Sequence, residues 1–230
     1  MGEVAVSDPG ELHPLGACRS IMLEKTQVRI VAGSLRGRRL TCVVHEGMRP
    51  TPQLVREALF SILGNAVPGR VFYDIFAGTG VVGLEAVSRG GTSARLIEKD
   101  PRQVTDILKY AQEFGVGDKV QVLRADAYRW AERWLPPGTT PVNLFLSPPF
   151  PDLSEKAEEF LALVTTLLEK APDESVLAIQ AEDGFPIDKL PDTDLWDVRR
   201  YGRNMLLFFV VSRDPVTIPP AGTAPTPTDG

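Results

Sequence analysis

The stretch Ser147-Pro148-Pro149-Phe150 follows the apolar run Val142–Leu146, and its residue types indicate a specific chemistry. Proline cannot donate a ladder hydrogen bond, so two consecutive prolines must end a buried strand in a rigid, extended turn. Open α/β sheets place their ligands at the carboxyl ends of strands. Phe150 could stack on a planar base, while the Ser147 side chain and the Pro148 carbonyl could accept hydrogen bonds. We therefore predict that Ser147, Pro148 and Phe150 act on the amino group of a nucleobase.

Such an amine is a poor nucleophile, because its lone pair is delocalised into the ring. Two acceptors that hold its hydrogens, together with a stacking partner, can turn the lone pair toward a methyl group. Alignment of the donor sulfur, the methyl carbon and the amine nitrogen then supplies much of the rate. No strong base is needed before transfer, since the proton leaves a cationic amine afterwards.

A glycine loop, Gly78-Thr79-Gly80-Val81-Val82-Gly83, follows the predicted strand Val71–Phe76 and opens the predicted helix Val81–Arg89. Its spacing is G-x-G-x-x-G, and Glu98 lies twenty residues beyond Gly78. This arrangement is typical of dinucleotide sites, where an acid holds the ribose hydroxyls. A nicotinamide-dependent oxidoreductase is therefore one interpretation of the loop.

The acids around this loop favour a different ligand. Asp74 stands four residues before Gly78, and Asp126 follows the predicted strand Val120–Leu123. A helix start favours the pyrophosphate of a dinucleotide, and a nearby carboxylate opposes it. S-adenosylmethionine instead carries an ammonium and a sulfonium, which suit carboxylates, and Asp126 could receive the adenine amine. For Asp126 a plain helix cap remains an equal alternative.

The remaining pattern predicts the elements that position these residues. Strands at Ala94–Glu98, Val142–Leu146 and Ser175–Gln180 alternate with helices, one of which begins at Asp100-Pro101 and another of which spans about 154–170. Such alternation indicates a parallel, doubly wound α/β sheet. The last two runs, Trp196–Tyr201 and Met205–Val211, flank a short turn signal and predict an antiparallel hairpin. On the Asp100 helix, Val104, Ile107, Leu108 and Ala111 are expected to face inward.

Another hairpin is predicted before the glycine loop, with strands Gln27–Ala32 and Arg38–Val44 and a basic tip at Gly33–Gly37. Thr51-Pro52 then opens a helix, with Thr51 as its N-cap, and Gly64 ends it. The helix residues expected to face inward are Leu54, Val55, Ala58, Leu59 and Ile62.

The net charge of −5 hides an uneven distribution. From Arg19 to Arg56 the chain carries eight Lys or Arg and only two acids, so the rest of the chain is strongly acidic. This pattern indicates an arm that faces a polyanion, joined to a small-molecule domain, although a solvated charged face would look similar. We divide the chain into a disordered extension (1–18), a basic hairpin-helix module (19–66), a methyltransferase domain (67–213) and a disordered Pro-rich tail (214–230).

Two cysteines and two histidines define no disulfide framework and no metal site. No apolar run reaches the roughly 18 residues needed to span a bilayer, and the first residues do not form a signal peptide. We expect a monomer in the cytoplasm, without membrane contact.

In its motifs and their order, the chain resembles the bacterial 16S ribosomal RNA (guanine-N2) methyltransferase family from about Gln27 to Val211. The motifs that carry this resemblance are Arg29–Gly33, Arg36–Leu40, Met48–Pro52, Val55–Phe60, Asp74–Gly80, Gly83–Ala86 and Leu96–Glu98. The resemblance implies a class I methyltransferase sheet of seven strands, the last antiparallel, with an N-terminal β-hairpin and helix that engage RNA.

The resemblance also implies S-adenosylmethionine as the cofactor and 16S ribosomal RNA, in the small subunit or its assembly intermediate, as the partner. The cofactor-binding residues that the resemblance implies are Asp74, Gly78, Gly80, Glu98 and Asp126, and we predict that Phe76, Lys99 and Ala127 belong to the same cofactor site. The predicted RNA-binding residues are Arg36, Arg38, Arg39, Arg49, Thr51 and Arg56.

Ser147 departs from the family pattern, which has Asp at this position, or Asn in related amino-methyltransferases. A serine hydroxyl is a neutral group that also donates, and losing a charged acceptor could cost roughly 2–4 kcal/mol of transition-state stabilisation. A homologue that binds cofactor and RNA but methylates weakly is therefore the second hypothesis.

Overall fold

The structure, a computed structural model, describes residues 24–44 and 50–213 of the 230-residue chain. The predictions made for residues 1–18, for Arg49 and for residues 214–230 lie outside these ranges.

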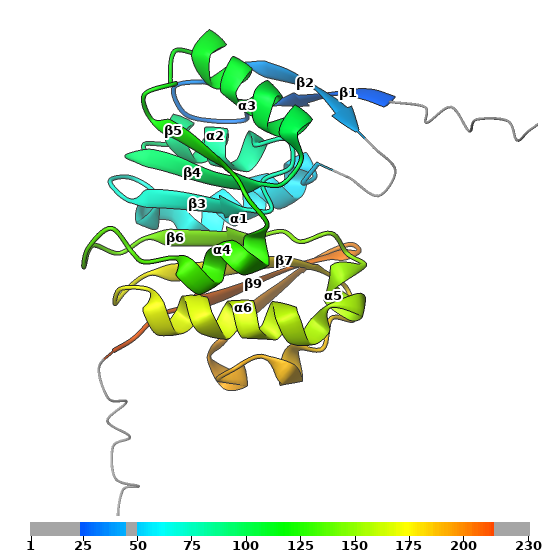
Figure 1. Cartoon of the computed structure of the whole chain (residues 1–230), viewed down its shortest axis with the longest axis vertical. Coiled ribbons are helices and arrows are strands. Elements are labelled where there is room, and N and C mark those ends of the chain that lie inside the picture. Colours follow the sequence, from blue (N-terminus) through cyan, green and yellow to red (C-terminus); the bar gives the residue numbers. More distant parts are fainter. Residues whose placement is uncertain (1–23, 45–49, 214–230) are drawn as a thin grey trace, which may run out of the picture.

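A seven-stranded sheet forms the centre of the molecule, in the order β5-β4-β3-β6-β7-β9-β8 (Figure 1). Its strands are β3 (Val71–Ile75), β4 (Ser93–Glu98), β5 (Val120–Arg124), β6 (Asn143–Leu146), β7 (Val176–Glu182), β8 (Asp197–Tyr201) and β9 (Asn204–Val210). Strands β3 to β7 pair in parallel, and β9 lies antiparallel between β7 and β8. The predicted α/β sheet with its antiparallel last strand is confirmed.

Helices cover both faces of this sheet. One hydrophobic cluster joins the sheet to α1 (Gln53–Leu63), α2 (Val81–Ser88) and α3 (Pro101–Glu113). The other joins it to α4 (Ala127–Arg133) and α6 (Ala157–Lys170), which lie in front of the sheet in Figure 1. Parallel strands buried on both faces need this double cover. Short 3-10 turns occur at Gly64–Ala66, Ile187–Lys189 and Thr193–Leu195.

Two helices differ from the sequence prediction. The sequence did not predict helix α4, because a helix of seven residues is too short to show a clear periodicity of apolar residues. The single helix expected near 154–170 is two helices, α5 (Asp152–Glu155) and α6. They separate at Lys156, whose φ of −125° and ψ of 36° are not helical.

The N-terminal hairpin consists of β1 (Glu24–Arg29) and β2 (Arg39–Val44), so its first strand begins three residues earlier than predicted. Its loop folds back onto the end of α2. The backbone N–H of Ser34 donates to the Ser88 carbonyl at 2.8 Å, and the N–H of Leu35 donates to the Ser88 hydroxyl at 2.8 Å. Gly33 has a φ of +83°, and a Cβ there would lie 1.8 Å from the Ser88 carbonyl oxygen. Only glycine permits this close approach.

The same hairpin also packs against α3. The Tyr110 hydroxyl accepts from the Thr41 N–H at 2.9 Å and donates to the Thr41 carbonyl at 3.0 Å. Apolar side chains of the hairpin and α1 belong to the same buried cluster as one face of the sheet. The predicted boundary between the hairpin-helix module and the methyltransferase domain, at residue 66, stays a prediction. Side chains from both sides of this boundary belong to one hydrophobic cluster.

Helix α1 begins one residue later than predicted, with Pro52 as its N-cap and no side-chain capping bond. The N-cap predicted for Thr51 is therefore wrong, whereas Gly64 does end the helix with a φ of +45°. Leu54 and Ile62 were expected inside but are 65% and 39% exposed. The buried stripe of α1 instead consists of Val55, Arg56, Leu59, Phe60 and Leu63.

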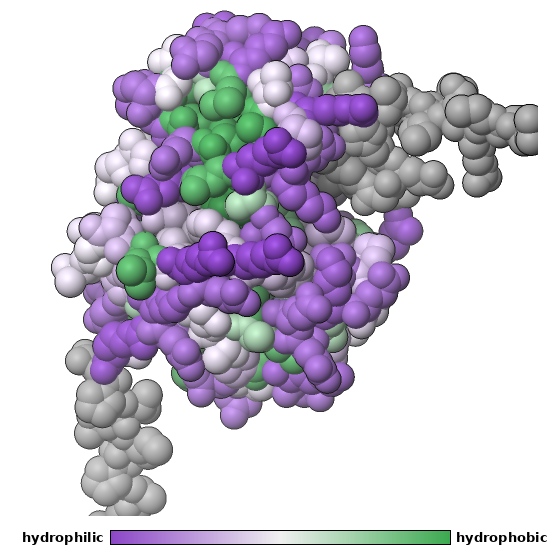
Figure 2. Space-filling model, in the orientation of Figure 1, coloured by the Kyte–Doolittle hydropathy of each residue, from purple (hydrophilic) through white to green (hydrophobic). Residues whose placement is uncertain are grey.

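The inward position predicted for Leu108 on α3 is also wrong, because this side chain is 43% exposed. Ile107 and Ala111 fill the buried side of that helix. Figure 2 shows hydrophobic residues gathered over α3 and β5, whereas most of the same face is hydrophilic. In both helices the periodicity predicted an apolar face wider than the stripe that the sheet covers.

Candidate functional site

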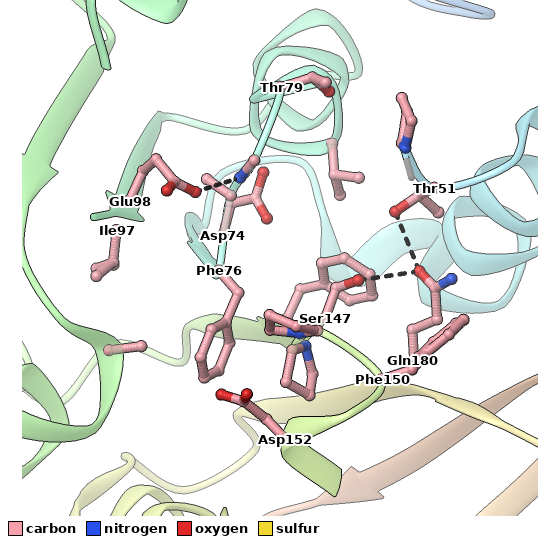
Figure 3. A pocket seen from close by; sticks show the side chains of 18 of the residues that line it. Thr51, Asp74, Phe76, Thr79, Ile97, Glu98, Ser147, Phe150, Asp152 and Gln180 are labelled. Carbon is pink, nitrogen blue, oxygen red and sulfur yellow. Dashed lines mark hydrogen bonds between the residues drawn. The ribbon is translucent and has the colours of Figure 1, made fainter. Parts of the chain in front are cut away.

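One pocket of about 1010 Å³ runs along the carboxyl ends of the parallel strands. It brings together Asp74 from β3, Glu98 from β4, Asp126 after β5, Ser147 after β6 and Gln180 from β7. Figure 3 shows Glu98 and Asp74 on one side of this pocket and Thr51, Gln180 and Ser147 on the other. The topology thus places the glycine loop and the proline turn, which are far apart in sequence, around one cavity.

Gly78 and Gly80 both have positive φ, at 53° and 72°, which explains why the loop needs glycine. Gly78 lines the pocket, but Gly80 is not among the lining residues. A Cβ on Gly80 would lie 2.6 Å from Cγ1 of Ile107, and one on Gly83 would lie 2.9 Å from Cγ of Leu96. These two glycines let α2 approach its neighbours, and the cofactor contact predicted for Gly80 stays a prediction.

Glu98 is held rigidly by two backbone donors. Its Oε2 accepts from the Gly78 N–H at 2.7 Å, and its Oε1 accepts from the Asp100 N–H at 2.8 Å. Its side chain is largely buried, while the neighbouring Lys99 is exposed and also lines the pocket. Because each carboxylate oxygen has two lone pairs, Glu98 can still accept bonds from hydroxyl groups in the pocket.

Asp74 is 1% exposed, and its Oδ2 accepts from the Gly83 N–H at 2.8 Å. The pKa of its carboxyl group is raised to about 7, mainly by burial and also by the negative Glu98, while the bond from the Gly83 N–H opposes the shift. Asp74 and Glu98 therefore occupy two of the loop's backbone donors, at Gly83 and Gly78. A pyrophosphate would need such donors, so the nicotinamide interpretation is not favoured.

Asp126 is the N-cap of α4, since its Oδ1 accepts from the N–H groups of Tyr128 and Arg129 at 3.1 and 3.2 Å. The capping alternative is thus correct, and Asp126 also lines the pocket beside the buried Ala127. Its Oδ2 takes no part in these two bonds and can accept a bond from a ligand.

Phe76 lines the pocket between Asp74 and the proline turn (Figure 3). Its φ of +68° is unusual for a residue with a Cβ, and such conformations cluster at functional sites. Its ring meets that of Tyr128 edge-on, with centroids 5.4 Å apart. The Tyr128 hydroxyl donates to Oδ2 of Asp152 at 3.0 Å, and Nζ of Lys156 donates to the same oxygen at 3.2 Å. Tyr128 and Asp152 are not among the predicted site residues, because the sequence pattern did not indicate α4 or the start of α5.

Ser147, Pro148 and Phe150 all line the pocket, in the turn that follows β6. The Ser147 N–H donates to the Ile75 carbonyl at 3.2 Å, which fixes the turn against the end of β3. The Ser147 hydroxyl donates to Oε1 of Gln180 at 3.2 Å, and the Thr51 hydroxyl donates to the same oxygen at 3.0 Å. Gln180 was missed as a site residue, although a single polar residue within the apolar run Val176–Ala181 is a usable signal.

The predicted RNA-binding residues separate into exposed and buried groups. Arg36, Arg38 and Arg39 are exposed on the hairpin, and the Arg38 guanidinium lies 5.7 Å from the Phe114 ring centroid. Thr51 is 8% exposed and points into the pocket (Figure 3).

Arg56 is 1% exposed, so the RNA contact predicted for it is wrong. Its side chain lies between α1 and α2, where it donates to the Thr51 carbonyl at 2.7 Å, the Arg29 carbonyl at 2.8 Å and Glu85 at 3.4 Å. Burial lowers its pKa, and Glu85 opposes that shift. A buried guanidinium needs such partners, and here they link the hairpin, α1 and the pocket.

Within residues 24–44 and 50–213, no three His, Cys, Asp or Glu side chains cluster as a metal site would require. In the same ranges, no helix has the length and apolar character needed to cross a membrane.

The strand order, the antiparallel β9 and the pocket at the strand ends define a class I methyltransferase fold. The chain belongs to the family described as "Conserved hypothetical protein 95", whose model matches residues 28–210. Among solved structures it is similar to a protein described as "Putative methyltransferase yhhF from Escherichia coli". The TM-score is 0.66 at 27% identity, with 82% of this chain and 100% of that chain covered.

Two curated relatives extend this result. A Bacillus subtilis protein named "Putative rRNA methyltransferase YlbH" is 30% identical over 166 residues, which cover 72% of this chain and 87% of the relative. An Escherichia coli protein named "Ribosomal RNA small subunit methyltransferase D" is 37% identical over 125 residues. That alignment covers 54% of this chain and 61% of the relative.

Proposed function

We propose that this protein transfers a methyl group from S-adenosylmethionine to the N2 amine of a guanine in 16S ribosomal RNA. The observation that carries this proposal is the single pocket that joins Glu98 and Asp74 to the turn Ser147-Pro148-Pro149-Phe150. The names of the two curated relatives support ribosomal RNA as the substrate.

The donor end of the pocket fits a cationic nucleoside. S-adenosylmethionine would supply an electrophilic methyl group on a positively charged sulfur. Glu98, fixed by Gly78 and Asp100, would accept from ribose hydroxyls, and Oδ2 of Asp126, which takes no part in the capping bonds, would accept from the adenine amine. Asp74 supplies a carboxylate whose ionised form a nearby ammonium or sulfonium stabilises.

The other end of the pocket fits a base with an exocyclic amine. The Ser147 hydroxyl and the Pro148 carbonyl accept from the two N–H groups of that amine, and Phe150 stacks on the ring. These contacts orient the nitrogen lone pair, and positioning supplies the rate. After transfer the cationic amine loses a proton, so the chain needs no strong base.

The exposed Arg36, Arg38 and Arg39 would contact RNA phosphates from the hairpin, whose loop packs on the end of α2 away from the glycine loop. Arg49, which lies outside the described residues, belongs to the same basic segment. The proposal includes the small subunit or its assembly intermediate as partner, and a monomer that acts in the cytoplasm.

The test is to incubate the purified protein with labelled S-adenosylmethionine and small ribosomal subunits from cells that lack the corresponding methyltransferase. Nucleoside analysis of the 16S RNA should then show label in N2-methylguanosine. The matched control is Glu98→Ala, which should lose binding of S-adenosylhomocysteine and label transfer together. Label in another nucleoside, or none where an active relative labels the same subunits, would contradict the proposal.

A further inference from the structure

Gln180 lies on β7, is 3% exposed, and reaches the pocket from the side opposite Glu98 (Figure 3). Its Oε1 accepts two hydrogen bonds, from the Thr51 hydroxyl at 3.0 Å and from the Ser147 hydroxyl at 3.2 Å. A carbonyl oxygen has two lone pairs, so these bonds use both of them. The buried amide oxygen is therefore fully occupied by two hydroxyl groups.

The orientation of this amide is fixed from its other end. Nε2 of Gln180 donates to Oδ1 of Asn204 at 3.1 Å, at the point where β9 begins. Since the nitrogen faces Asn204, the oxygen faces Thr51 and Ser147. Thr51 is held in turn, because the buried Arg56 donates to its carbonyl at 2.7 Å.

This arrangement determines what Ser147 offers to a ligand. A serine hydroxyl normally rotates and can present either its proton or its lone pairs. Here the proton is directed at Gln180, so the oxygen has only lone pairs left for the pocket. An amino group presents N–H donors to the turn, and a hydroxyl proton pointing at it would oppose binding.

We propose that Gln180, held by Asn204 and Thr51, is a positioning residue that makes the Ser147 hydroxyl an obligate acceptor for the substrate amine. This inference rests on the proposed function, because it assumes that Ser147 contacts the amine. It explains how a serine serves at a position where the family resemblance implies an aspartate. A carboxylate has no proton to direct, so it requires a donor from its neighbour rather than an acceptor.

The test compares Gln180→Met with Gln180→Glu, two changes that nearly conserve side-chain volume. Gln180→Met removes the acceptor and should lower kcat about tenfold, less than the roughly 100-fold loss that follows removal of a directly contacting group. Gln180→Glu also loses the donor to Asn204 but keeps an acceptor for both hydroxyls, so its kcat should fall clearly less than that of Gln180→Met. The affinity for S-adenosylhomocysteine and the KM for the small subunit should change little in either variant.

The same two changes made together with Ser147→Asp provide a readout that a purely structural role would not move. With aspartate at 147 the amide must donate to the carboxylate, so Gln180→Glu should now lower kcat strongly, because two carboxylates face each other. With serine at position 147, Gln180→Glu should therefore have a higher kcat than Gln180→Met. With aspartate at position 147, this advantage of Gln180→Glu should be lost.

Three results would overturn the role of Gln180. These are an unchanged kcat in Gln180→Met, an equal loss in Gln180→Met and Gln180→Glu, or the same ranking whichever residue stands at 147. A wild-type protein that binds S-adenosylhomocysteine but methylates no guanine would instead refute the proposed function, and this inference with it.

Discussion

The buried carboxylate of Asp74 accepts the backbone N–H of Gly83 at 2.8 Å, and this bond joins the end of β3 to the first turn of α2. It places an acid under the glycine loop, where its surroundings disfavour the charge. Burial is the main cause that raises the pKa of Asp74 to about 7, and Glu98 contributes to the same shift. The group is thus partly protonated near neutral pH, and its charge depends on what occupies the pocket.

We expect the affinity for S-adenosylhomocysteine, which carries the same ammonium as the methyl donor, to increase as pH rises from about 6 to 8. The reason is that the ammonium favours ionised Asp74, so binding must displace a proton below the raised pKa. Calorimetry in buffers of different ionisation enthalpy measures both the affinity and the proton release. Asp74→Asn serves as control and should show little pH dependence; a wild-type affinity that is constant or falls over this range would contradict the assignment.

Arg56 has a structural role, according to its burial and its three partners. We expect Arg56→Met to lower the free energy of unfolding by about 3 kcal/mol, because it leaves the Thr51 and Arg29 carbonyls without this donor. Glu85 keeps its bonds to Arg89, at 2.7 and 3.0 Å, which limits the loss. Chemical denaturation measures this change, with the exposed Arg36→Met as control within about 0.5 kcal/mol of wild type. Unchanged stability together with weaker subunit binding would restore a direct RNA contact for Arg56.

The positions of Arg56 and Thr51 in the structure show which parts of the fold and of the site the sequence could predict and which it could not. The pattern of strands, glycines and acids correctly predicted the sheet, its antiparallel last strand and the strand ends that form the pocket. It could not predict that the N-terminal segment contributes Thr51 to the same pocket, because that contact joins residues 129 positions apart. A basic residue in an amphipathic helix is normally interpreted as a surface charge, and only the packing of α1 on α2 shows that Arg56 is buried.

The proline turn illustrates the same limit for the chemistry. Its residue types indicated an amine substrate, and its departure from the family at Ser147 suggested weakened catalysis. The hydrogen bond from Ser147 to Gln180 spans 33 positions and lies outside any local pattern. Gln180 itself looked like one end of a buried strand, so its effect on the hydroxyl could emerge only from the paired strands β6 and β7.

The exposed arginines of the hairpin loop provide a test of RNA engagement that is independent of catalysis. Neutralising Arg36 and Arg39 with glutamine should weaken binding to the small subunit and reduce the salt dependence of that binding. The slope of the logarithm of the binding constant against the logarithm of the salt concentration should become shallower by roughly 0.7–0.9 for each phosphate that an arginine no longer neutralises. Arg38 is left intact because it lies over the Phe114 ring. Filter binding across salt concentrations measures the slope, and the affinity for S-adenosylhomocysteine should not change.

The matched control for this double variant is neutralisation of Arg199 and Arg200. Both are exposed on β8, the strand at the opposite edge of the sheet from β5. Their pairs with Asp197 and Asp183 are exposed and contribute little to stability. If the β8 control weakens subunit binding as much as the hairpin variant, the effect comes from net charge and the hairpin has no special role.

Ser147 decides how fast the proposed reaction proceeds. Ser147→Ala removes one of the two acceptors for the amine and should lower kcat about 100-fold, as the loss of one preorganised hydrogen-bonding group does in other enzymes. Ser147→Asp replaces a neutral acceptor by a charged one, which forms a stronger hydrogen bond, and should raise kcat if the Gln180 amide turns to donate to it. Single-turnover kinetics with saturating S-adenosylmethionine separates this step from subunit binding and release. Because neither change touches Glu98 or Asp74, the affinity for S-adenosylhomocysteine should stay constant in both variants. A Ser147→Ala protein that methylates at the wild-type rate would show that the turn holds the base through Pro148 and Phe150 alone.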